Sequence, residues 1–312
     1  MAVHLVTGGA GFIGSHIAEE LLRQGERVRI VDDLSTGKLE NIRGLKGDLE
    51  FVQGDICGEA LMRRAAQGVE VIYHQAAIPS VPRSLDEPLT TNRASVDGTL
   101  RVLLAAREAG VRRVVYASSS SVYGEIDELP VTETLPTVPI SPYGVAKLAG
   151  ELYARVFHHC YGMETVVLRY FNVFGPRQDP KSMYAGVTPI FVRELLAGRT
   201  CTIFGDGEQT RDFTSVGNIV QANLKAASAR ESPGKVFNVA SGIQTTVNRL
   251  YGTISGILGV DAPPRYDEPR PGDIRHSLAD ITAARELLGY EPAISLQEGL
   301  ELTVDWLKTQ DL

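Results

Sequence analysis

Short apolar segments alternate with amphipathic ones through the first half of the chain. The short segments have the length of buried parallel strands and cover residues 3–7, 27–31, 49–52, 69–73, 113–117 and 165–168. Between them, apolar residues recur at helical spacing, most clearly over residues 12–23, 100–108 and 143–157. This alternation predicts an α/β fold, a doubly wound parallel sheet with helices on both faces.

The alternation weakens after about residue 175, where prolines and glycines interrupt the chain. Single strands and helices are still predicted over residues 201–204, 220–227, 236–239 and 296–308. We therefore expect one domain over residues 1–174 and a smaller α/β lobe built mainly from residues 175–312. The two are interleaved, because segments within about 201–240 are expected to return to the first domain.

A glycine-rich turn joins the first predicted strand to the first predicted helix. Gly8, Gly11 and Gly14 have G-x-x-G-x-x-G spacing, and Phe12 and Ile13 lie between the last two. Glycines let the backbone turn tightly and approach a pyrophosphate, which then binds at the helix N-terminus. In this strand–turn–helix context the motif predicts a dinucleotide site, and a purely structural turn is the alternative.

Acidic residues follow the next two strands. Asp32 ends the second strand and is followed by Asp33. A carboxylate at this position accepts hydrogen bonds from the ribose 2′-OH of NAD and repels the 2′-phosphate of NADP. Asp55, with Ile56, follows the third strand and is a candidate to bind the adenine amino group, although loop aspartates are commonly only solvated. We therefore predict that NAD is the cofactor.

Tyr143 and Lys147 are four residues apart in a predicted helix that starts after Ser141-Pro142. Residues at this spacing share a helix face, so the ammonium can approach the phenol. The ordinary tyrosine pKa, near 10, is about three pH units too high for a base at neutral pH. A neighbouring ammonium and a bound NAD⁺ ring would each stabilise the phenolate. The pair alone is common on helices, but beside a dinucleotide motif it predicts a catalytic base.

Four serines at positions 118–121 end the strand that precedes Tyr123-Gly124. Ligands bind at the carboxyl ends of strands in open α/β sheets. Ser119 and Ser120 are therefore candidates to contact the substrate, and Ser119 to relay a proton to Tyr143. We expect at least two of the four serines to serve only the turn.

Composition and charge narrow the functional class. The net charge is −7, whereas a nucleic-acid surface needs a basic patch. No apolar run is long enough to span a membrane, and we identify no signal peptide. The three cysteines have no metal-ligand spacing and form no even disulfide set, so we expect a cytoplasmic protein without a metal site.

Taken together, these motifs resemble those of the extended short-chain dehydrogenases/reductases, over nearly the whole chain. Within that superfamily the chain resembles the UDP-hexose 4-epimerases that act on UDP-glucose, UDP-galactose and UDP-N-acetylglucosamine. The closer match is carried by residues 74–77, 169–180, 205–207, 211–213 and 270–273. The resemblance implies a Rossmann sheet, an NAD cofactor and an isomerase. The reaction would interconvert UDP-glucose and UDP-galactose through a transient 4-keto sugar.

The resemblance also implies roles for individual residues. Gln75, Ala76, Ala77 and Tyr170 would join the cofactor site. Asn172, Arg211 and Arg270 would hold the UDP diphosphate, Asp273 would bind the ribose of UDP, and Phe204 would border the uracil. An arginine that forms only a surface ion pair, or an aromatic side chain that only packs in a core, is the alternative at these positions.

Two features extend the implied substrate range to UDP-GlcNAc and UDP-GalNAc. Ser277 stands where members restricted to UDP-glucose and UDP-galactose can carry tyrosine, which leaves room for an N-acetyl group. The stretch 75–84, which includes Ser80, resembles enzymes that accept acetylated sugars. A plain polar loop residue is the alternative for Ser277.

Other functions occur on the same fold. Sugar-nucleotide dehydratases carry Thr-Asp-Glu at the positions of Ser119, Ser120 and Ser121, and decarboxylases carry glutamate at Ser121, so neither reaction fits. UDP-glucuronate 4-epimerases remain an alternative, although they usually carry threonine at Asn172. A non-catalytic NAD-binding module is the other alternative.

One position departs from the family pattern. Ser95 replaces an asparagine that usually begins Asn-Val-x-Gly-Thr, so a contact to the cofactor site is lost or taken by the serine.

The resemblance also implies a homodimer. It would form through the apolar stripes Leu100, Leu103 and Leu104 in one helix and Val145, Leu148, Leu152 and Val156 in another.

Overall fold

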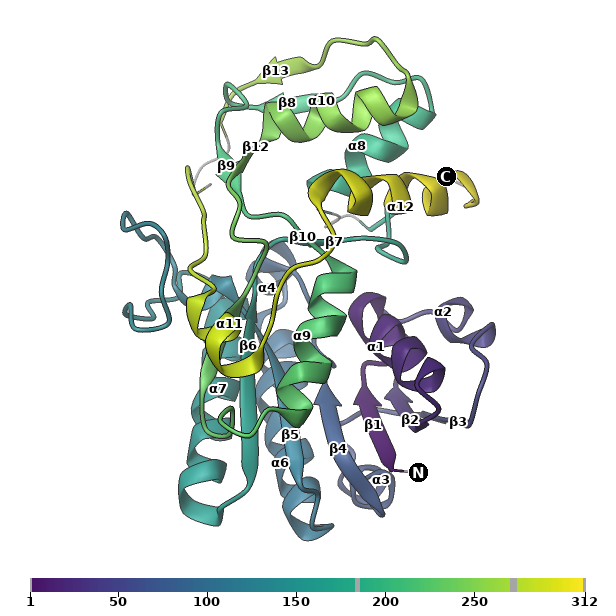
Figure 1. The fold of residues 1–312 in the computed structure, drawn as a ribbon, viewed down its shortest axis with the longest axis vertical. Helices are drawn as coiled ribbons and strands as arrows, with labels where there is room; N and C mark the ends of the chain where they lie inside the picture. The colour runs from purple at the N-terminus through teal and green to yellow at the C-terminus, as the bar shows by residue number, and fades with distance from the viewer. Residues whose placement is uncertain (1, 183–185, 270–273, 311–312) are drawn as a thin grey trace.

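The computed structural model describes residues 2–182, 186–269 and 274–310. A parallel sheet of seven strands forms its lower half, in the order β11-β6-β5-β4-β1-β2-β3 (Figure 1). These strands are β1 (Val3–Thr7), β2 (Arg27–Asp32), β3 (Leu49–Gln53), β4 (Val69–His74), β5 (Arg113–Ser119), β6 (Glu164–Tyr170) and β11 (Val236–Val239). The predicted doubly wound α/β fold is confirmed. Every predicted strand of the first half is present, and the strand order reverses between β1 and β4.

Helices cover both faces of this sheet. On one face α1 (Phe12–Arg23), α9 (Val216–Ser228) and α11 (Thr282–Leu288) pack against one another. On the other face lie α3 (Glu59–Ala65), α6 (Gly98–Glu108) and α7 (Pro142–Tyr161). Each face therefore has its own buried apolar cluster, as expected for strands that are apolar on both sides.

Shorter elements connect the main ones around the carboxyl ends of the strands. They are α2 (Glu40–Arg43), α4 (Val81–Asp86), α5 (Pro88–Asn92), a π-helical turn η1 (Arg93–Asp97) and a 3-10 turn η2 (Ser120–Val122). The sequence reasoning missed α2, α3, α4 and α5, which are too short to show a clear helical period.

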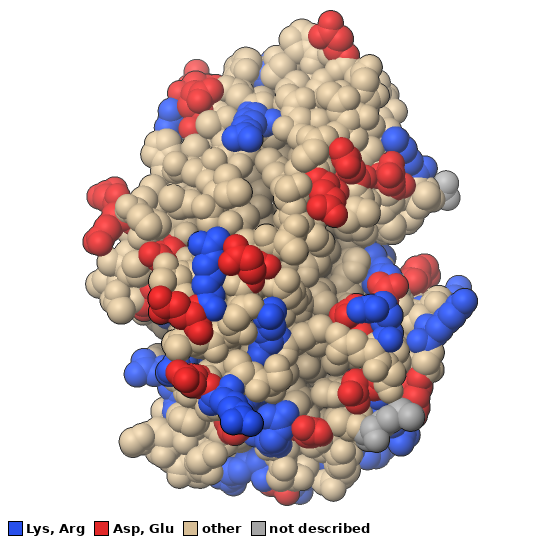
Figure 2. Space-filling view, viewed as in Figure 1, with Lys and Arg blue, Asp and Glu red and all other residues tan. Residues whose placement is uncertain are grey.

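The upper half is a smaller lobe with a third apolar cluster. It contains α8 (Val187–Leu196), α10 (Val247–Leu258), α12 (Leu296–Lys308) and the strand pair β8 (Thr202–Phe204) and β13 (Arg265–Asp267). Two further pairs lead into and out of it: β7 (Val173–Phe174) with β10 (Thr214–Ser215), and β9 (Thr210–Arg211) with β12 (Thr245–Thr246). On the face shown in Figure 2, acidic and basic side chains are interspersed.

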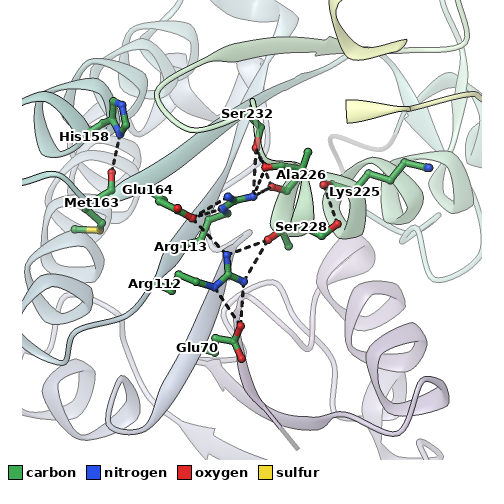
Figure 3. Close-up of polar contacts among 12 residues, drawn as sticks. Glu70, Arg112, Arg113, His158, Met163, Glu164, Lys225, Ala226, Ser228 and Ser232 are labelled. Atoms are coloured by element: carbon green, nitrogen blue, oxygen red, sulfur yellow. Dashed lines mark hydrogen bonds and ion pairs between the residues drawn. The ribbon is translucent and has the colours of Figure 1, made fainter. Parts of the chain in front are cut away.

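The chain returns from the smaller lobe to the sheet through α9 and β11. Arg113, at the start of β5, is 3% exposed and anchors the end of α9 (Figure 3). Its Nη1 donates to the carbonyls of Ala226 and Ala229 at 2.8 Å, and its Nε donates to Glu164 at 2.8 Å. The carbonyls at a helix C-terminus have no partner within the helix, so the guanidinium satisfies them and fixes α9 to the sheet.

Candidate active site

A cavity of about 910 Å³ lies at the carboxyl ends of the strands, beside the point between β1 and β4 where the strand order reverses. This is the position at which doubly wound sheets bind ligands. Every residue predicted to bind the cofactor lines it. They are Gly8, Gly11, Phe12, Ile13, Gly14, Asp32, Asp33, Asp55, Ile56, Gln75, Ala76, Ala77, Tyr143, Lys147 and Tyr170.

The glycine turn is packed too tightly for side chains. Gly8 has a φ of +68°, and a Cβ there would lie 2.7 Å from backbone atoms of Ala76. A Cβ on Gly14 would lie 2.2 Å from the carbonyl oxygen of Gly8. Gly11 is the N-cap of α1 and provides no side-chain cap, so the first N–H groups of the helix remain available to an anion at the cavity.

Asp32 is held in place by the backbone of this same turn. Its Oδ2 accepts from the Ala10 N–H at 2.9 Å and its Oδ1 accepts from the Leu34 N–H at 2.8 Å. Burial raises the pKa of the Asp32 carboxyl, and the two backbone donors oppose that rise. Each oxygen keeps a second lone pair for a ribose hydroxyl.

Asp55 follows β3, the strand next to the one that Asp32 ends, and the Gly54 N–H before it donates to the Asp32 carbonyl at 3.0 Å. Its Oδ1 accepts from the Cys57 N–H at 2.8 Å, and its Oδ2 pairs with Arg93 at 2.6 Å. Both Asp55 and Arg93 line the cavity, so the carboxylate is oriented by protein donors beside any bound base.

Lys147 and Tyr143 lie in the first two turns of α7. The helix starts at Pro142 because the Ser141 side chain accepts from the Gly144 N–H at 3.1 Å. The Lys147 ammonium is buried, donates to the Ala117 carbonyl at 2.8 Å, and lies 5.9 Å from the centre of the Tyr143 ring. Burial lowers the pKa of Lys147 to about 8, and Glu151, one turn further along α7, opposes that change.

The pKa of Tyr143 in the protein alone is set mainly by burial. Burial raises it, and the nearby Ser119 hydroxyl partly opposes the rise. The Lys147 ammonium is directed to the Ala117 carbonyl. Within the protein, Ser119 is therefore the group that favours the phenolate.

The four serines have different roles in the structure. Ser118 donates to the buried carboxylate of Glu151, while Ser119 contacts Tyr143 and also bonds Ser121 at 3.1 Å. Glu151 in turn accepts two hydrogen bonds from the guanidinium of Arg169, at 2.9 and 2.7 Å. Ser118 thus belongs to the packing of α7 against the sheet, and Ser119 is the serine that meets the phenol.

Gln75 and Tyr170 enter the cavity from β4 and β6. The Tyr170 hydroxyl donates to Gln75 Oε1 at 3.2 Å, and Gln75 Nε2 donates to Asn223 Oδ1 at 3.1 Å. Asn223 lies in α9 and is fully buried. The sequence reasoning missed Asn223, because nothing in its local sequence shows that α9 returns to this wall of the cavity.

A segment after β7 crosses the cavity toward α1. Arg177, Gln178 and Asp179 line the cavity, and Asp179 pairs with Lys38 from the loop after β2 at 3.1 Å. Arg177 pairs with Glu19 of α1 at 2.7 Å. These residues were also missed as site candidates, because their partners are more than a hundred residues away in the chain.

The residues predicted for the UDP-sugar are placed less completely. Ser80 and Tyr143 line the cavity, whereas Ser119, Ser120, Asn172, Phe204, Arg211 and Ser277 do not. Asn172 has a φ of +24° between β6 and β7, and its carbonyl accepts from the Thr214 N–H at 3.2 Å. Arg211 and Phe204 lie in strands of the smaller lobe. Arg270 and Asp273 are outside the described residues.

A buried carboxylate joins two of these predicted segments. Asp212, next to Arg211, accepts from the Ser241 N–H at 2.9 Å and the Gly242 N–H at 3.0 Å. It also accepts from the Ala279 N–H at 3.4 Å, two residues after Ser277. The Arg211 and Ser277 segments are therefore held against one another. Ser95, the departure from the family pattern, is buried in η1 and does not line the cavity.

The residues of the cavity fit an NAD molecule. The turn of Gly8 and Gly14 leaves no room for a Cβ, the N-terminus of α1 opens into the cavity, and Asp32 keeps acceptor capacity beside it. Over the described ranges, no cluster of three His, Cys, Asp or Glu side chains is arranged to hold a metal ion. In the same part of the chain, no helix has the length and apolarity needed to cross a membrane.

Comparison with known proteins agrees with this geometry. Residues 4–240 match the NAD dependent epimerase/dehydratase family. A UDP-glucose 4-epimerase of Mycolicibacterium smegmatis is 43% identical over 310 residues, 98% of each chain. Among solved structures, a UDP-N-acetylglucosamine 4-epimerase of Methanobrevibacter ruminantium in complex with UDP-N-acetylmuramic acid has a TM-score of 0.95 at 41% identity, over 99% of each chain.

A second solved structure gives the same result. The UDP-glucose 4-epimerase of Thermotoga maritima with UDP-glucose has a TM-score of 0.93 at 42% identity, and the match covers 98% of each chain. With the glycine turn, Asp32 and the Tyr143/Lys147 pair all on one cavity, the chain belongs to the NAD dependent epimerase/dehydratase family, and within it to the UDP-sugar 4-epimerases, isomerases that use NAD.

Proposed function

We propose that this enzyme interconverts UDP-glucose and UDP-galactose, and also UDP-GlcNAc and UDP-GalNAc. The observation that carries the proposal is the Tyr143/Lys147 pair on the wall of a dinucleotide cavity, with the Lys147 ammonium 5.9 Å from the centre of the Tyr143 ring. The positions around it hold serines 119–121, where dehydratases would carry acids that eliminate water. A site with a base and a hydride carrier, but without an acid to divert the intermediate, supports epimerisation.

The proposed mechanism assigns one task to each side chain. When bound, NAD supplies a hydride acceptor that later returns the hydride. Tyr143 takes the proton from the sugar 4-OH as the C4 hydrogen leaves with its electron pair, which gives a 4-keto sugar. Ser119 favours the phenolate form of Tyr143 from the end of β5. After the ketone turns its other face, Tyr143 returns the proton to the oxygen, so the reaction has no net redox change.

The substrate range rests on residues of the smaller lobe. Ser277 occupies a position where tyrosine would fill the space beside the sugar 2-substituent, and Asp212 ties the neighbouring Ala279 to the Arg211 segment. Asn172 differs from the threonine that is usual in UDP-glucuronate 4-epimerases. All four proposed substrates share the UDP moiety. We assign Arg211, Arg270 and Asp273 to this shared part, as the family resemblance implies.

A single product analysis tests the reaction. The purified enzyme is incubated separately with UDP-galactose, UDP-GalNAc and UDP-glucuronate, and the products are resolved by chromatography. We expect the first two to be epimerised and UDP-glucuronate to be unchanged. The variant Tyr143→Phe serves as the control: it should fold normally and lose at least a hundredfold in kcat. Wild-type turnover of UDP-glucuronate alone would overturn the substrate proposal, and a fully active Tyr143→Phe would overturn the mechanism.

We also propose a homodimer, with α7 at its interface. In α6 the Leu103 side chain is 1% exposed, so that predicted stripe is mostly used within the subunit. In α7, by contrast, Val145, Leu152 and Val156 are about half exposed at helical spacing. A second copy of the chain would cover them. Sedimentation should show a dimer at micromolar concentration, and Leu152→Glu should shift it to monomer; a monomeric wild-type protein would contradict the proposal.

A cytoplasmic location is the last part of the proposal. Cys57, Cys160 and Cys201 are free thiols in the structure, which suits a reducing compartment. Fractionation of the source cells, with an antibody to this chain, would place the protein.

A further inference from the structure

Asn223 closes a ring of hydrogen bonds behind the cavity wall. Its Nδ2 donates to the carbonyl of Ile219 at 2.8 Å and to the Tyr170 hydroxyl at 2.8 Å, and its Oδ1 accepts from Gln75 Nε2 at 3.1 Å. The Tyr170 hydroxyl completes the ring by donating to Gln75 Oε1 at 3.2 Å. Asn223 itself is fully buried, so no water competes for its amide group.

A backbone carbonyl decides which atom of the Asn223 amide donates and which accepts. The Ile219 carbonyl can only accept, so the Asn223 amide must turn its nitrogen toward it. Its oxygen is then left for Gln75 Nε2, and its second N–H occupies the lone pair of the Tyr170 hydroxyl. The Tyr170 hydroxyl proton then has two acceptors within reach, Gln75 Oε1 at 3.2 Å and Asn223 Oδ1 at 3.1 Å. The Ile219 carbonyl in α9 therefore fixes the Asn223 amide, and the Asn223 oxygen in turn requires the nitrogen of the Gln75 amide to face it.

Without Asn223, the orientation of the Gln75 amide would no longer be fixed. A hydroxyl can donate to the oxygen of an amide or accept from its nitrogen, so Tyr170 alone would hold Gln75 equally well either way round. An amide that flips exchanges a donor for an acceptor at the same place. Gln75 is partly exposed and lines the cavity, so the flip would change what the cavity offers to a bound molecule.

We propose that Asn223 is a positioning residue for the cofactor: it sets the orientation of the Gln75 amide at the end of the cavity that holds Tyr143 and Tyr170. The inference rests on the proposed assignment of this cavity to NAD. The group that Gln75 would then recognise is a neutral polar one, a hydroxyl or carboxamide of the nicotinamide riboside half.

A second asparagine in α9 provides a matched control. Asn218 is 1% exposed and makes two hydrogen bonds with the backbone of Ile294, at 2.8 and 3.0 Å. It is five residues before Asn223 in the same helix, and it does not line or contact the cavity. Asn218→Ala therefore removes a buried asparagine with a similar number of partners but no connection to Gln75.

The experiment compares how fast the holoenzyme loses NAD. Wild type, Asn223→Ala and Asn218→Ala are purified with NAD bound, diluted into a nucleotide-scavenging resin, and the retained NAD is measured over time. We expect Asn223→Ala to lose NAD about tenfold faster than wild type, roughly the effect of one hydrogen bond. Asn218→Ala should lower the melting temperature about as much as Asn223→Ala does. Its rate of NAD loss should stay within twofold of the wild-type rate.

Gln75→Met gives a second test that leaves α9 intact, and it decides the matter if Asn223→Ala fails to fold. It should release NAD as fast as Asn223→Ala, and the double variant should be no faster than either single variant, because both act through the same amide. Equal NAD retention in Asn223→Ala and Asn218→Ala, or wild-type retention in Gln75→Met, would overturn the inference. Failure of the wild type to bind NAD would instead refute the proposed function.

Discussion

Replacing Lys147 by methionine should make the folded protein more stable while it removes activity. Methionine follows the shape of the lysine stem and fits a buried site without a charge. The ammonium of Lys147 is buried, and burial lowers its pKa from 10.5 to about 8 even though Glu151 opposes the change. The folded protein therefore carries a charge that the unfolded chain would hold more easily in water.

The pKa difference gives the magnitude. Between a folded pKa of about 8 and an unfolded pKa of 10.5, the charge costs about 3 kcal/mol of unfolding free energy at pH 7 and about 1.5 kcal/mol at pH 9.5. The methionine variant leaves the Ala117 carbonyl without the lysine donor, which costs about 1–2 kcal/mol. The variant should therefore be more stable by about 1–2 kcal/mol at pH 7.

The stability advantage of the Lys147→Met variant over the wild type must decrease as the pH rises. Between pH 8 and 10.5 the unfolded chain binds more protons at this lysine than the folded protein does, so the stability of the wild type rises with pH. Other groups titrate alike in both proteins, and the difference between them isolates Lys147. The variant's lead should shrink by about 2 kcal/mol from pH 7 to pH 9.5.

Urea unfolding of the two proteins, freed of nucleotide and followed by fluorescence, measures this difference at several pH values. A constant difference across the range would refute the argument, because it would mean that Lys147 is not desolvated. A wild type more stable than the variant at pH 7 would mean that the hydrogen bond to Ala117 outweighs the cost of the charge. Epimerase assays on the same samples should show loss of turnover in the variant at every pH.

Three further predictions concern single residues. Asp32→Asn should narrow the preference for NAD over NADP in binding titrations, because it removes the charge that repels a 2′-phosphate while keeping the side-chain shape; an unchanged preference would assign Asp32 to the turn alone. Arg113→Leu should lower the unfolding free energy by about 3 kcal/mol, whereas Arg112→Leu, next in the chain and 43% exposed at the side chain, should cost under about 1 kcal/mol; equal losses in denaturant unfolding would contradict the role of burial. Ser277→Tyr should reduce kcat/KM for UDP-GalNAc at least tenfold more than for UDP-galactose, and equal reductions would place Ser277 away from the sugar.

The parts of the site that were predictable from sequence are those whose chemistry is local. The spacing of Gly8 and Gly14 must follow one strand and start one helix, and Tyr143 and Lys147 must share a helix face. Asp32 ends a strand whose position is set by the sheet. Such features need no knowledge of distant contacts, and all of them line the same cavity.

The parts that were missed depend on contacts between distant segments. Asn223 reaches Gln75 across 148 positions of the chain, and Lys38 meets Asp179 only because the segment after β7 crosses the cavity. No local pattern marks these residues, since an asparagine in a helix or a lysine in a loop is ordinary by itself. Spacing also cannot show that the Lys147 ammonium donates to the Ala117 carbonyl, a contact made across 30 positions of the chain.

The return of the chain to its own sheet has a consequence during synthesis. β6 ends at Tyr170, but its neighbour β11 begins only at Val236, after the chain has passed through the smaller lobe. At a translation rate of about 5–20 residues per second, the growing chain exposes the edge of β6 for several seconds before its partner is made. An uncovered strand edge readily pairs with another chain. On the ribosome, the edge of β6 therefore needs protection from other chains until β11 has been made.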